Sequence, residues 1–557
     1  MRRSTSRLVV AAACIVALAA AAGAGLAASD SGKVRRGGTL VFAGASDPTY
    51  LDPALVSDGE SFRVTKQIFE GLVELKPGTT RVQPALARSW KVGRDGKTWT
   101  FRLRRGVRFH DGTPFNAAAV CFNFNRQYNF RGPFQDASAS YYWQNIFGGY
   151  RRNESSSLSP SLYRSCRAKG RYTAVIKLRK RSGPFIPSLV ISSFAIQSPT
   201  ALRRYNANRG ELRAGTFYPT GSYAFSHPTG TGPYVFRSWR VGEKVELVRN
   251  PRYWGKKPGI SRLIIRPISN NTARLQALQT GEVNGYDLVQ PQDVATIRRN
   301  NRLKLVNRPP FNVGYVTINS AHPPFNNVLV RRAVAYGLDR RSVVRSFYGG
   351  RGTVAHEFMP PSIPFGYARN VQRYPFNPER AKALLRRAGL SLPVKVDFWY
   401  PTNVSRPYMP NPKLNFEAFS ASLERSGFNV VAHSAPWRPD YVKHVNDGTA
   451  GDLNLIGWTG DYGDPDNFVG TFFQSYSPQF GFRNPRLFRI LDRAESTVSI
   501  KKRAALYEQA NRLIARLVPA VPYVHTRPAL GFQRRVRGYV PSPVGTEPFS
   551  TVFFGGA

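Results

Sequence analysis

The hydrophobic pattern changes its period repeatedly along the chain, which predicts strands and helices in alternation. An apolar run at residues 39–43 predicts a strand, and an Asp-Gly turn divides residues 90–103 into a hairpin. Apolar positions at helical spacing predict helices at residues 63–72 and from residue 117 to residue 124. Residues 127–170 are rich in Tyr, Ser, Gly and Asn and are predicted to be a long loop region.

The second half of the chain has a more regular alternation of the two patterns. Strands are expected at residues 313–318, 394–399, 429–432 and 453–458. Helices are expected at residues 273–280, 329–338, 378–388, 416–424 and 502–517. This order predicts α/β units, and no internal repeat interrupts it.

Length and composition agree with a folded protein of several domains. The chain has 557 residues, of which 42% are hydrophobic and 13% aromatic, so it is not a disordered chain. Its 42 prolines and 48 glycines indicate many turns and exclude a simple helical bundle.

The N-terminus has the pattern of a secretory signal peptide, predicted over residues 1–28. Three arginines precede an apolar stretch, residues 8–26, that ends in small residues. An uncleaved membrane anchor is the alternative, since the stretch is long enough to span a bilayer. Cleavage is preferred because the Ala/Gly-rich half is weakly hydrophobic. No later segment resembles a membrane span, so the protein is expected to be exported.

Two cysteines follow the signal segment, Cys121 and Cys166. An even pair in an exported chain predicts one disulfide, and two unrelated buried thiols are the alternative.

The formal net charge is +47, which first suggests a nucleic-acid partner. The basic residues are spread over the whole chain, no nucleic-acid-binding motif occurs, and the signal segment directs the chain outside the cell. A solvated surface, with electrostatic association to an anionic wall or membrane, is the preferred interpretation.

The segment Gly457–Phe468 places three aspartates close together in this basic chain. Asp464 and Asp466 precede Pro and Asn and are predicted to form a turn. A Ca²⁺ site is less favoured, because the twelve-residue loop with its terminal Glu is absent. Trp458 fits a core position and a ligand-contacting position equally well.

Short motifs occur in an order that resembles the extracytoplasmic solute-binding proteins of family 5, from peptide-type ABC transporters. The motifs include Leu51-Asp52-Pro53, Phe69-Glu70-Gly71-Leu72, Gly230-Thr231-Gly232-Pro233-Tyr234, Asn250-Pro251-Arg252-Tyr253-Trp254 and Pro519-Ala520-Val521-Pro522. Arg406-Pro407-Tyr408 and Gly457-Trp458-Thr459-Gly460-Asp461 resemble the dipeptide-binding members in particular.

The resemblance implies an α/β, periplasmic-binding-protein-like fold (class II, cluster C), with two main lobes around a hinge and an extra inserted domain. Lobe I is expected from residues 37–78, 222–305 and 525–557, lobe II from residues 79–221, and lobe III from residues 306–524.

The resemblance also implies a ligand site between lobes I and III. Arg406 is expected to bind the carboxylate of a dipeptide, and Asp461 its ammonium group. The other expected ligand-binding residues are Tyr408, Trp458, Gly457, Gly460, Ser57 and Gly59. Two anchors of opposite charge suit a zwitterion whose charges must be paired once water is removed. The proline-rich segment after Tyr408 departs from the family pattern.

The resulting expectation is a monomeric, non-enzymatic substrate-binding component of an ABC importer, without cofactor or metal. The permease and the ATPases are expected to be separate chains, because no phosphate-binding loop motif occurs here. A longer oligopeptide, a metal chelate or a glycoside remain alternative ligands. A secreted hydrolase or a basic wall-associated protein is less favoured, since no Gly-x-Ser-x-Gly motif occurs and the latter depends on charge alone.

Overall fold

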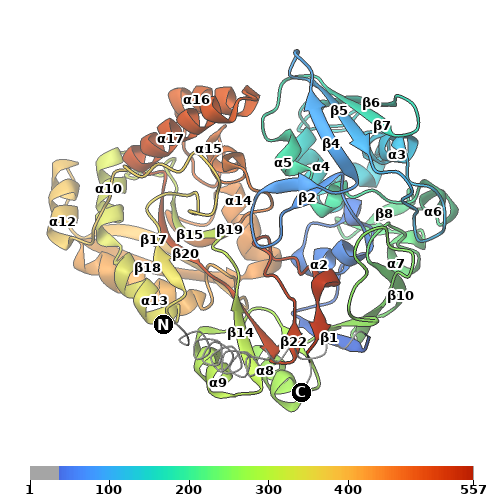
Figure 1. Ribbon diagram of the computed structural model, residues 1–557. Helices are drawn as coiled ribbons and strands as arrows, with labels where there is room; N and C mark the ends of the chain where they lie inside the picture. The colour runs from blue at the N-terminus through green and yellow to red at the C-terminus, as the bar shows by residue number, and fades with distance from the viewer. Residues whose placement is uncertain (1–36, 556–557) are drawn as a thin grey trace, which may run out of the picture.

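The computed structural model describes residues 37–555 and contains three large β-sheets (Figure 1). The predicted signal peptide lies outside the described residues. The seven-stranded sheet has the order β10-β11-β12-β1-β13-β21-β14. Its strands are β1 Thr39–Gly44, β10 Tyr234–Arg240, β11 Lys244–Arg249, β12 Arg262–Pro267, β13 Gly285–Tyr286, β14 Leu303–Asn307 and β21 Ala529–Gln533. This sheet is therefore assembled from segments that lie far apart in the chain.

The six-stranded sheet has the order β16-β20-β15-β19-β17-β18 and is a mixed sheet. Its strands are β15 Asn312–Ile318, β16 Gly352–Val354, β17 Val394–Thr402, β18 Phe428–Pro436, β19 Leu453–Thr459 and β20 Ala520–Thr526. Its helices include α10 Val328–Gly337, α11 Arg340–Phe347, α12 Pro378–Arg387, α13 Pro412–Arg425, α14 Val442–Asp447, α15 Gly470–Phe473, α16 Pro485–Ser496 and α17 Ile500–Leu517. Every residue of β15 and β20 is buried, so these two strands form the centre of this region.

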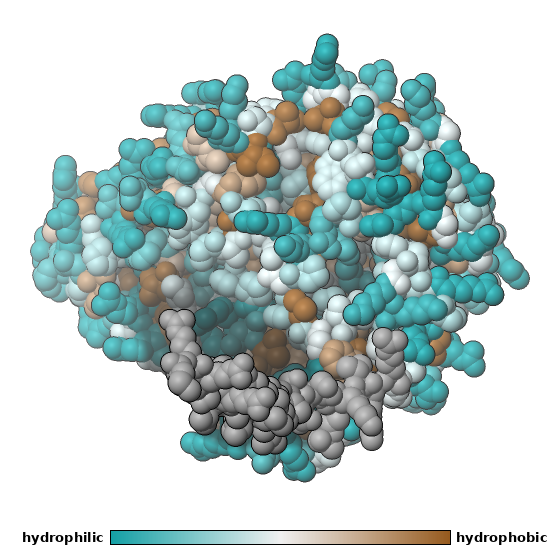
Figure 2. Space-filling view, in the orientation of Figure 1, coloured by the Kyte–Doolittle hydropathy of each residue, from teal (hydrophilic) through white to brown (hydrophobic). Residues whose placement is uncertain are grey.

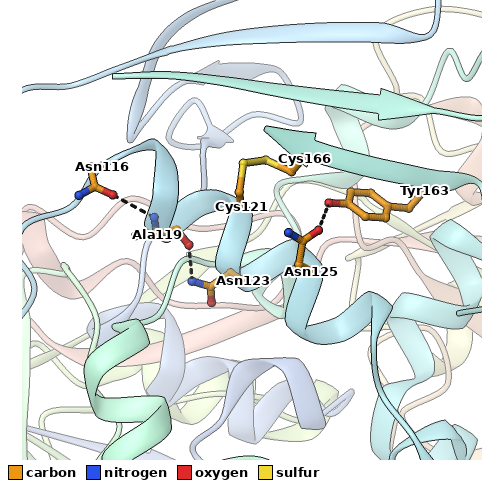
Figure 3. The surroundings of a disulfide bond; sticks show 7 residues. All are labelled: Asn116, Ala119, Cys121, Asn123, Asn125, Tyr163 and Cys166. Atoms are coloured by element: carbon orange, nitrogen blue, oxygen red, sulfur yellow. Dashed lines mark hydrogen bonds between the residues drawn. A yellow bond between two sulfur atoms is a disulfide. The ribbon is translucent and has the colours of Figure 1, made fainter. Parts of the chain in front are cut away.

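The four-stranded sheet, in the order β4-β5-β7-β6, lies at the upper right of Figure 1. Its strands are β4 Ala87–Val92, β5 Thr98–Leu103, β6 Tyr163–Ala168 and β7 Thr173–Leu178, and α3 Ala117–Tyr128 and α4 Ala137–Phe147 pack with it. A disulfide joins Cys121 of α3 to Cys166 of β6, which confirms the predicted pair (Figure 3).

The smaller elements connect these three regions. They are α2 Gly59–Ile68, α5 Phe185–Ser188, α6 Pro199–Arg204, α7 Tyr223–Ser226, α8 Asn271–Thr280, α9 Val294–Arg299, β2 Val73–Leu75, β3 Val82–Pro84, β8 Gly210–Arg213, β9 Thr216–Pro219, β22 Val536–Arg537 and β23 Phe553–Phe554.

The prediction of a long loop over residues 127–170 was wrong, because the segment contains α4 and β6. Its aromatic residues are not exposed: Trp143 and Phe147 are buried in the same core as Phe101 of β5. Burial of aromatic side chains against a sheet stabilises a helix whose composition alone does not favour one.

Two predicted helices have different ends in the structure. The predicted helix 63–72 is α2, which begins at Gly59 and ends at Ile68, because Glu70 pairs with Ile196 instead of continuing the helix. The helix predicted at residues 416–424 begins at Pro412, where proline suits the first turn. The hairpin and the predicted strand before Asp461 are confirmed as β4–β5 and β19.

The mixture of packed helices and sheets confirms the predicted α/β class. The residue bounds of the lobes remain a prediction. Within residues 37–555, no helix is both long and apolar enough to cross a membrane. Figure 2 shows hydrophilic side chains over most of the visible face, with separate hydrophobic patches between them.

The buried carboxylate of Glu70 joins three segments that the sequence motifs mark. It accepts hydrogen bonds from the Tyr253 hydroxyl at 2.7 Å, from Trp254 Nε1 at 2.8 Å and from the Thr231 hydroxyl at 2.7 Å. Burial raises the pKa of Glu70 to about 7, and these hydrogen bonds oppose the rise. The motifs therefore hold the seven-stranded sheet region to the chain that leaves α2.

A buried group of charges lies where the chain passes from the seven-stranded to the six-stranded sheet. Arg63 and Arg308 both pair with Asp287, at 3.0 and 2.9 Å, and both also contact Glu547. Burial opposes ionisation of Asp287, yet Arg308 and Arg63 together lower its pKa to about 2. Segments from both ends of the chain are thus joined beside this crossing.

Candidate functional site

A cavity of about 400 Å³ lies beside α2 and is the first candidate ligand space. Phe62 and Lys66 of α2, Tyr253 and Trp254 form part of its wall, and Asp461 extends into it from the six-stranded sheet region. Segments from different parts of the fold therefore line one space, as is common for ligand-binding pockets.

Asp461 follows the end of β19 and is held by two side chains. The Tyr142 hydroxyl donates to its Oδ1 at 2.6 Å, and Asn467 Nδ2 donates to its Oδ2 at 3.3 Å. The Asp461 backbone amide donates in turn to Asn467 Oδ1 at 2.7 Å. Burial raises the pKa of Asp461 to about 6, against the effect of both hydrogen bonds. The side chains that the structure describes bring no cation into an ion pair with this carboxylate.

Tyr142 was not among the predicted site residues. It belongs to α4, in the segment predicted to be a loop, and its ring packs against Phe62 with the centroids 5.7 Å apart. Burial raises the pKa of its hydroxyl above the ordinary value, and the charge of Asp461 adds to this, so the group stays a hydrogen-bond donor. The consecutive aromatics from Tyr141 to Trp143 were the only available signal.

Arg406 lies at a second, smaller cavity and not at the one that Asp461 lines. Its backbone forms a pair of hydrogen bonds with Met409, at 3.1 and 2.9 Å. Its guanidinium lies over the Trp437 ring, 4.4 Å from the centroid. The structure therefore does not bring the two predicted anchors into the wall of one cavity.

Tyr408 and Gly457 lie in direct contact and join the two predicted motifs. A Cβ at Gly457 would come within 2.3 Å of the Tyr408 ring and 2.4 Å of the Val313 carbonyl oxygen, so only glycine leaves room for the ring. Tyr408 is 5% exposed, and burial raises the pKa of its hydroxyl to about 12. Its ring supports β19 from within the core.

Trp458 and Gly460 flank this contact. The Trp458 ring meets Phe472 edge to face, with centroids 5.6 Å apart, and packs at the border of a core cluster. A Cβ at Gly460 would come within 2.5 Å of the Phe311 ring. Both residues help to position the segment that carries Asp461.

Ser57 and Gly59 lie at the exposed start of α2. No atom lies within 4 Å of a Cβ built at Gly59, and neither residue belongs to the wall of the 400 Å³ cavity. Their role as ligand contacts remains a prediction.

Asp464 and Asp466 shape the turn after Asp461. Asp464 accepts the Asp466 backbone amide at 3.0 Å, and it forms a two-point ion pair with Arg503 of α17 at 2.7 and 2.6 Å. Asp466 accepts a hydrogen bond from the Tyr507 hydroxyl at 3.2 Å. The turn was predicted from the sequence, but its arginine partner was not. Across the described residues, no group of three His, Cys, Asp or Glu side chains is arranged to hold a metal ion.

Comparison with known proteins gives matches over almost the whole chain. A dipeptide-binding protein of Escherichia coli is 31% identical over 92% of this chain and 94% of its own. Heme-binding protein A of Haemophilus influenzae is 32% identical over 92% of this chain and 91% of its own. The solved periplasmic binding protein DppA of Helicobacter pylori, in complex with the peptide STSA, superimposes with a TM-score of 0.76. It is 29% identical and covers 94% of this chain and 99% of its own.

Residues 81–480 match the family described as bacterial extracellular solute-binding proteins, family 5, middle region. This match, the two curated relatives and the fold agree with one another. The chain therefore belongs to family 5 of the bacterial extracellular solute-binding proteins.

Proposed function

We propose that this protein is the substrate-binding component of an ABC importer and that it captures di- or oligopeptides through their free ammonium group. The observation that carries this proposal is the half-buried Asp461 carboxylate at the wall of a 400 Å³ cavity, with two hydrogen-bond donors and no ion pair among the described side chains. A buried carboxylate that must ionise needs a cation, and a peptide N-terminus supplies one.

The aromatic wall of the cavity supports a peptide of variable side chain. Phe62, Tyr253 and Trp254 present large, rigid surfaces that contact different side chains without a specific hydrogen bond. The Escherichia coli relative is named a dipeptide-binding protein, and the solved Helicobacter pylori relative is in complex with a peptide. Both favour a peptide as the ligand class.

The protein is expected to act by closure and delivery, without catalysis. A ligand that contacts two regions biases the chain toward its closed form, which then docks on a membrane permease with its ATPases. The protein is expected to be an exported monomer whose positive charge also favours anionic surfaces.

The test compares free peptides with capped peptides of the same sequence by thermal shift and calorimetry. Free dipeptides and tripeptides are expected to raise the melting temperature, whereas N-acetylated forms, which lack the ammonium group, are not. Hemin serves as a comparison ligand, because one relative is named for heme binding. Equal stabilisation by free and N-acetylated peptides would exclude the ammonium contact, and stabilisation by hemin alone would exclude peptides as the ligand class.

A further inference from the structure

The two hairpins of the four-stranded sheet carry almost only positive charge. Residues 87–108 and 163–181, which contain β4–β5 and β6–β7, have sixteen Lys and Arg side chains but a single acidic one. The rest of the chain has 64 basic and 32 acidic residues. The fold therefore concentrates unbalanced charge in one region, although basic residues occur along the whole chain.

Alternation along the strands separates a core face of this sheet from a solvent face. Phe101 of β5 and Ile176 of β7 are buried in the core that also contains Trp143 of α4. Arg102 and Lys177 follow them in the sequence and are exposed. Since successive side chains point to opposite faces, these two cations lie on the face that is turned to solvent.

Four exposed cations lie on this solvent face, one from each strand, and are called the basic face below. They are Lys91 of β4, Arg102 of β5, Arg167 of β6 and Lys177 of β7. Their cross-strand neighbours are all short side chains, namely Ser89, Thr98, Thr100, Ser165, Thr173 and Val175. Within the described part of the chain, no acidic side chain forms an ion pair with any of the four. The cations therefore extend furthest from the sheet and remain available to an outside partner.

Asp95, the single acidic residue of the two hairpins, belongs to the turn between β4 and β5, at the upper edge of the molecule in Figure 1. Its Oδ1 accepts the backbone amides of Lys97 and Thr98 at 3.0 Å each, and its Oδ2 accepts the Thr98 hydroxyl at 2.7 Å. These hydrogen bonds lower the pKa of Asp95 to about 2. The carboxylate thus stabilises the turn and does not pair with the basic face.

A pair of like charges lies at the edge of the same sheet. The guanidinium groups of Arg105 and Arg171 are both exposed, and each lies 5.6 Å from the centroid of the Tyr172 ring. The ring attracts both cations and so keeps them near one another. Like charges that gather on one surface raise the local potential and attract anions.

We propose that the basic face binds the surface of an anionic lipid bilayer, so that the protein docks on a membrane through its four-stranded sheet. The four cations are distributed over the width of a sheet whose strands lie about 4.8 Å apart, and not along a groove. Such an array suits a plane of anionic head groups, whereas a linear polyanion is better suited by a groove or a single stripe of charge.

Docking through this sheet does not use the candidate peptide site. No residue of the basic face belongs to the wall of the 400 Å³ cavity. The proposal rests on the proposed export of the chain, but it does not depend on the peptide ligand.

The first experiment measures binding of the unmodified exported protein to vesicles by sedimentation. Vesicles of phosphatidylglycerol and phosphatidylcholine are compared with vesicles of phosphatidylcholine alone. Binding is expected only where phosphatidylglycerol is present. It should disappear at high salt, because the screening length falls from about 10 Å at 0.1 M to about 3 Å at 1 M.

The second experiment compares two variants that have the same net charge. The test variant removes the basic face and is Lys91→Gln/Arg102→Gln/Arg167→Gln/Lys177→Gln. The control removes two exposed arginines of α12 and two exposed lysines of α17 and is Arg386→Gln/Arg387→Gln/Lys501→Gln/Lys502→Gln. The test variant should bind phosphatidylglycerol vesicles at least about tenfold more weakly, and the control should change by less than about twofold.

Folding of both variants is established by circular dichroism. If the test variant does not fold, Arg102→Gln/Lys177→Gln replaces it, with Arg386→Gln/Lys501→Gln as its control.

The proposal is overturned if the unmodified protein does not bind phosphatidylglycerol vesicles, or if both variants lose binding equally, since net charge alone would then explain the effect. Binding of soluble polyphosphate through the basic face, without binding to vesicles, would also overturn it in favour of a linear polyanion. The vesicle assay contains no peptide, so its result is independent of the peptide assays that test the proposed function.

Discussion

Two aspartates of one short segment have opposite electrostatic surroundings. Asp464 is fully buried against the guanidinium of Arg503, while Asp461 has only the neutral donors Tyr142 and Asn467. The first carboxylate is satisfied by the fold itself. The second retains a raised pKa and is available to a ligand.

Arg503→Met should destabilise the protein strongly, because it leaves Asp464 buried without its cation. Loss of one partner of a buried ion pair costs about 3–5 kcal/mol. Urea unfolding measures the free energy of unfolding. Arg512→Met on the same helix is the control, since the Arg512–Glu508 pair is exposed and its loss should cost less than about 1 kcal/mol. Similar losses for both variants would contradict the assignment.

Peptide affinity should increase with pH until about pH 6 and then level off. Burial raises the pKa of Asp461 from 3.8 to about 6, so the ligand-free folded state keeps this proton over a range in which the unfolded state has lost it. This group therefore stabilises the ligand-free fold most below pH 4, and the contribution is lost as the pH rises to 6. Because a bound ammonium requires the ionised form, affinity should rise about tenfold between pH 5 and pH 7.

Calorimetry across this pH range measures the effect. The side chain of Asp461→Asn cannot ionise, so this variant should bind peptide more weakly by about 2–5 kcal/mol near neutral pH. Its affinity should also stay constant over the pH range in which Asp461 of the wild type titrates. A wild-type profile that stays flat from pH 5 to pH 7 would contradict the ammonium contact.

At the scale of elements, local patterns were sufficient where a segment determines its own structure. The β4–β5 hairpin and β19 follow from turn residues and apolar runs, whereas Asp461, which comes after the end of β19, was predicted from the resemblance of its motif to dipeptide-binding proteins. The helix α4 depends on burial against a distant sheet, so its aromatics resembled a loop composition. Tyr142 and Arg503 were missed for the same reason: each meets its aspartate across a long stretch of chain.

The disulfide between α3 and β6 should contribute strongly to stability. It closes a loop with a sequence separation of 45, which the loop-entropy relation makes worth about 3–5 kcal/mol. Mass spectrometry of the unreduced, exported protein should show two hydrogens fewer than the thiol form. The double variant Cys121→Ser/Cys166→Ser should melt at a lower temperature. An equal melting temperature for the reduced wild type would contradict this contribution.

At the scale of the whole molecule, hydrogen bonds join the four-stranded and six-stranded sheet regions along one seam. Tyr142 meets Asp461, the Thr80 hydroxyl donates to the Ser362 carbonyl at 2.8 Å, and the Gly183 amide donates to the Glu495 carbonyl at 2.6 Å. The seam therefore completes the surroundings of Asp461, the carboxylate proposed to bind the ligand.

Gly183 does not line the proposed peptide cavity, but Gly183→Ala should open this seam and so weaken peptide binding. Its Cβ would lie 2.4 Å from the Thr497 carbonyl oxygen and 2.5 Å from Arg503 Nε, so the two regions must separate. We expect about tenfold weaker affinity by calorimetry and a larger radius of gyration in solution scattering. Lys180→Ala is the seam control, because it removes only the exposed Lys180–Glu495 pair and should change affinity by less than about 1 kcal/mol. A Gly183→Ala protein with unchanged scattering and affinity would contradict the closure model.

The strand order of the seven-stranded sheet determines when this sheet can be completed during synthesis of the chain. β1 is among the first described residues to leave the ribosome, but β21, which lies between β13 and β14, is among the last. The other two large sheets end at residues 178 and 526, so neither of them contains β21 or any later residue. A product truncated before Ala529 would carry two finished sheets and an open gap in the third. Completion of the seven-stranded sheet therefore depends on β21.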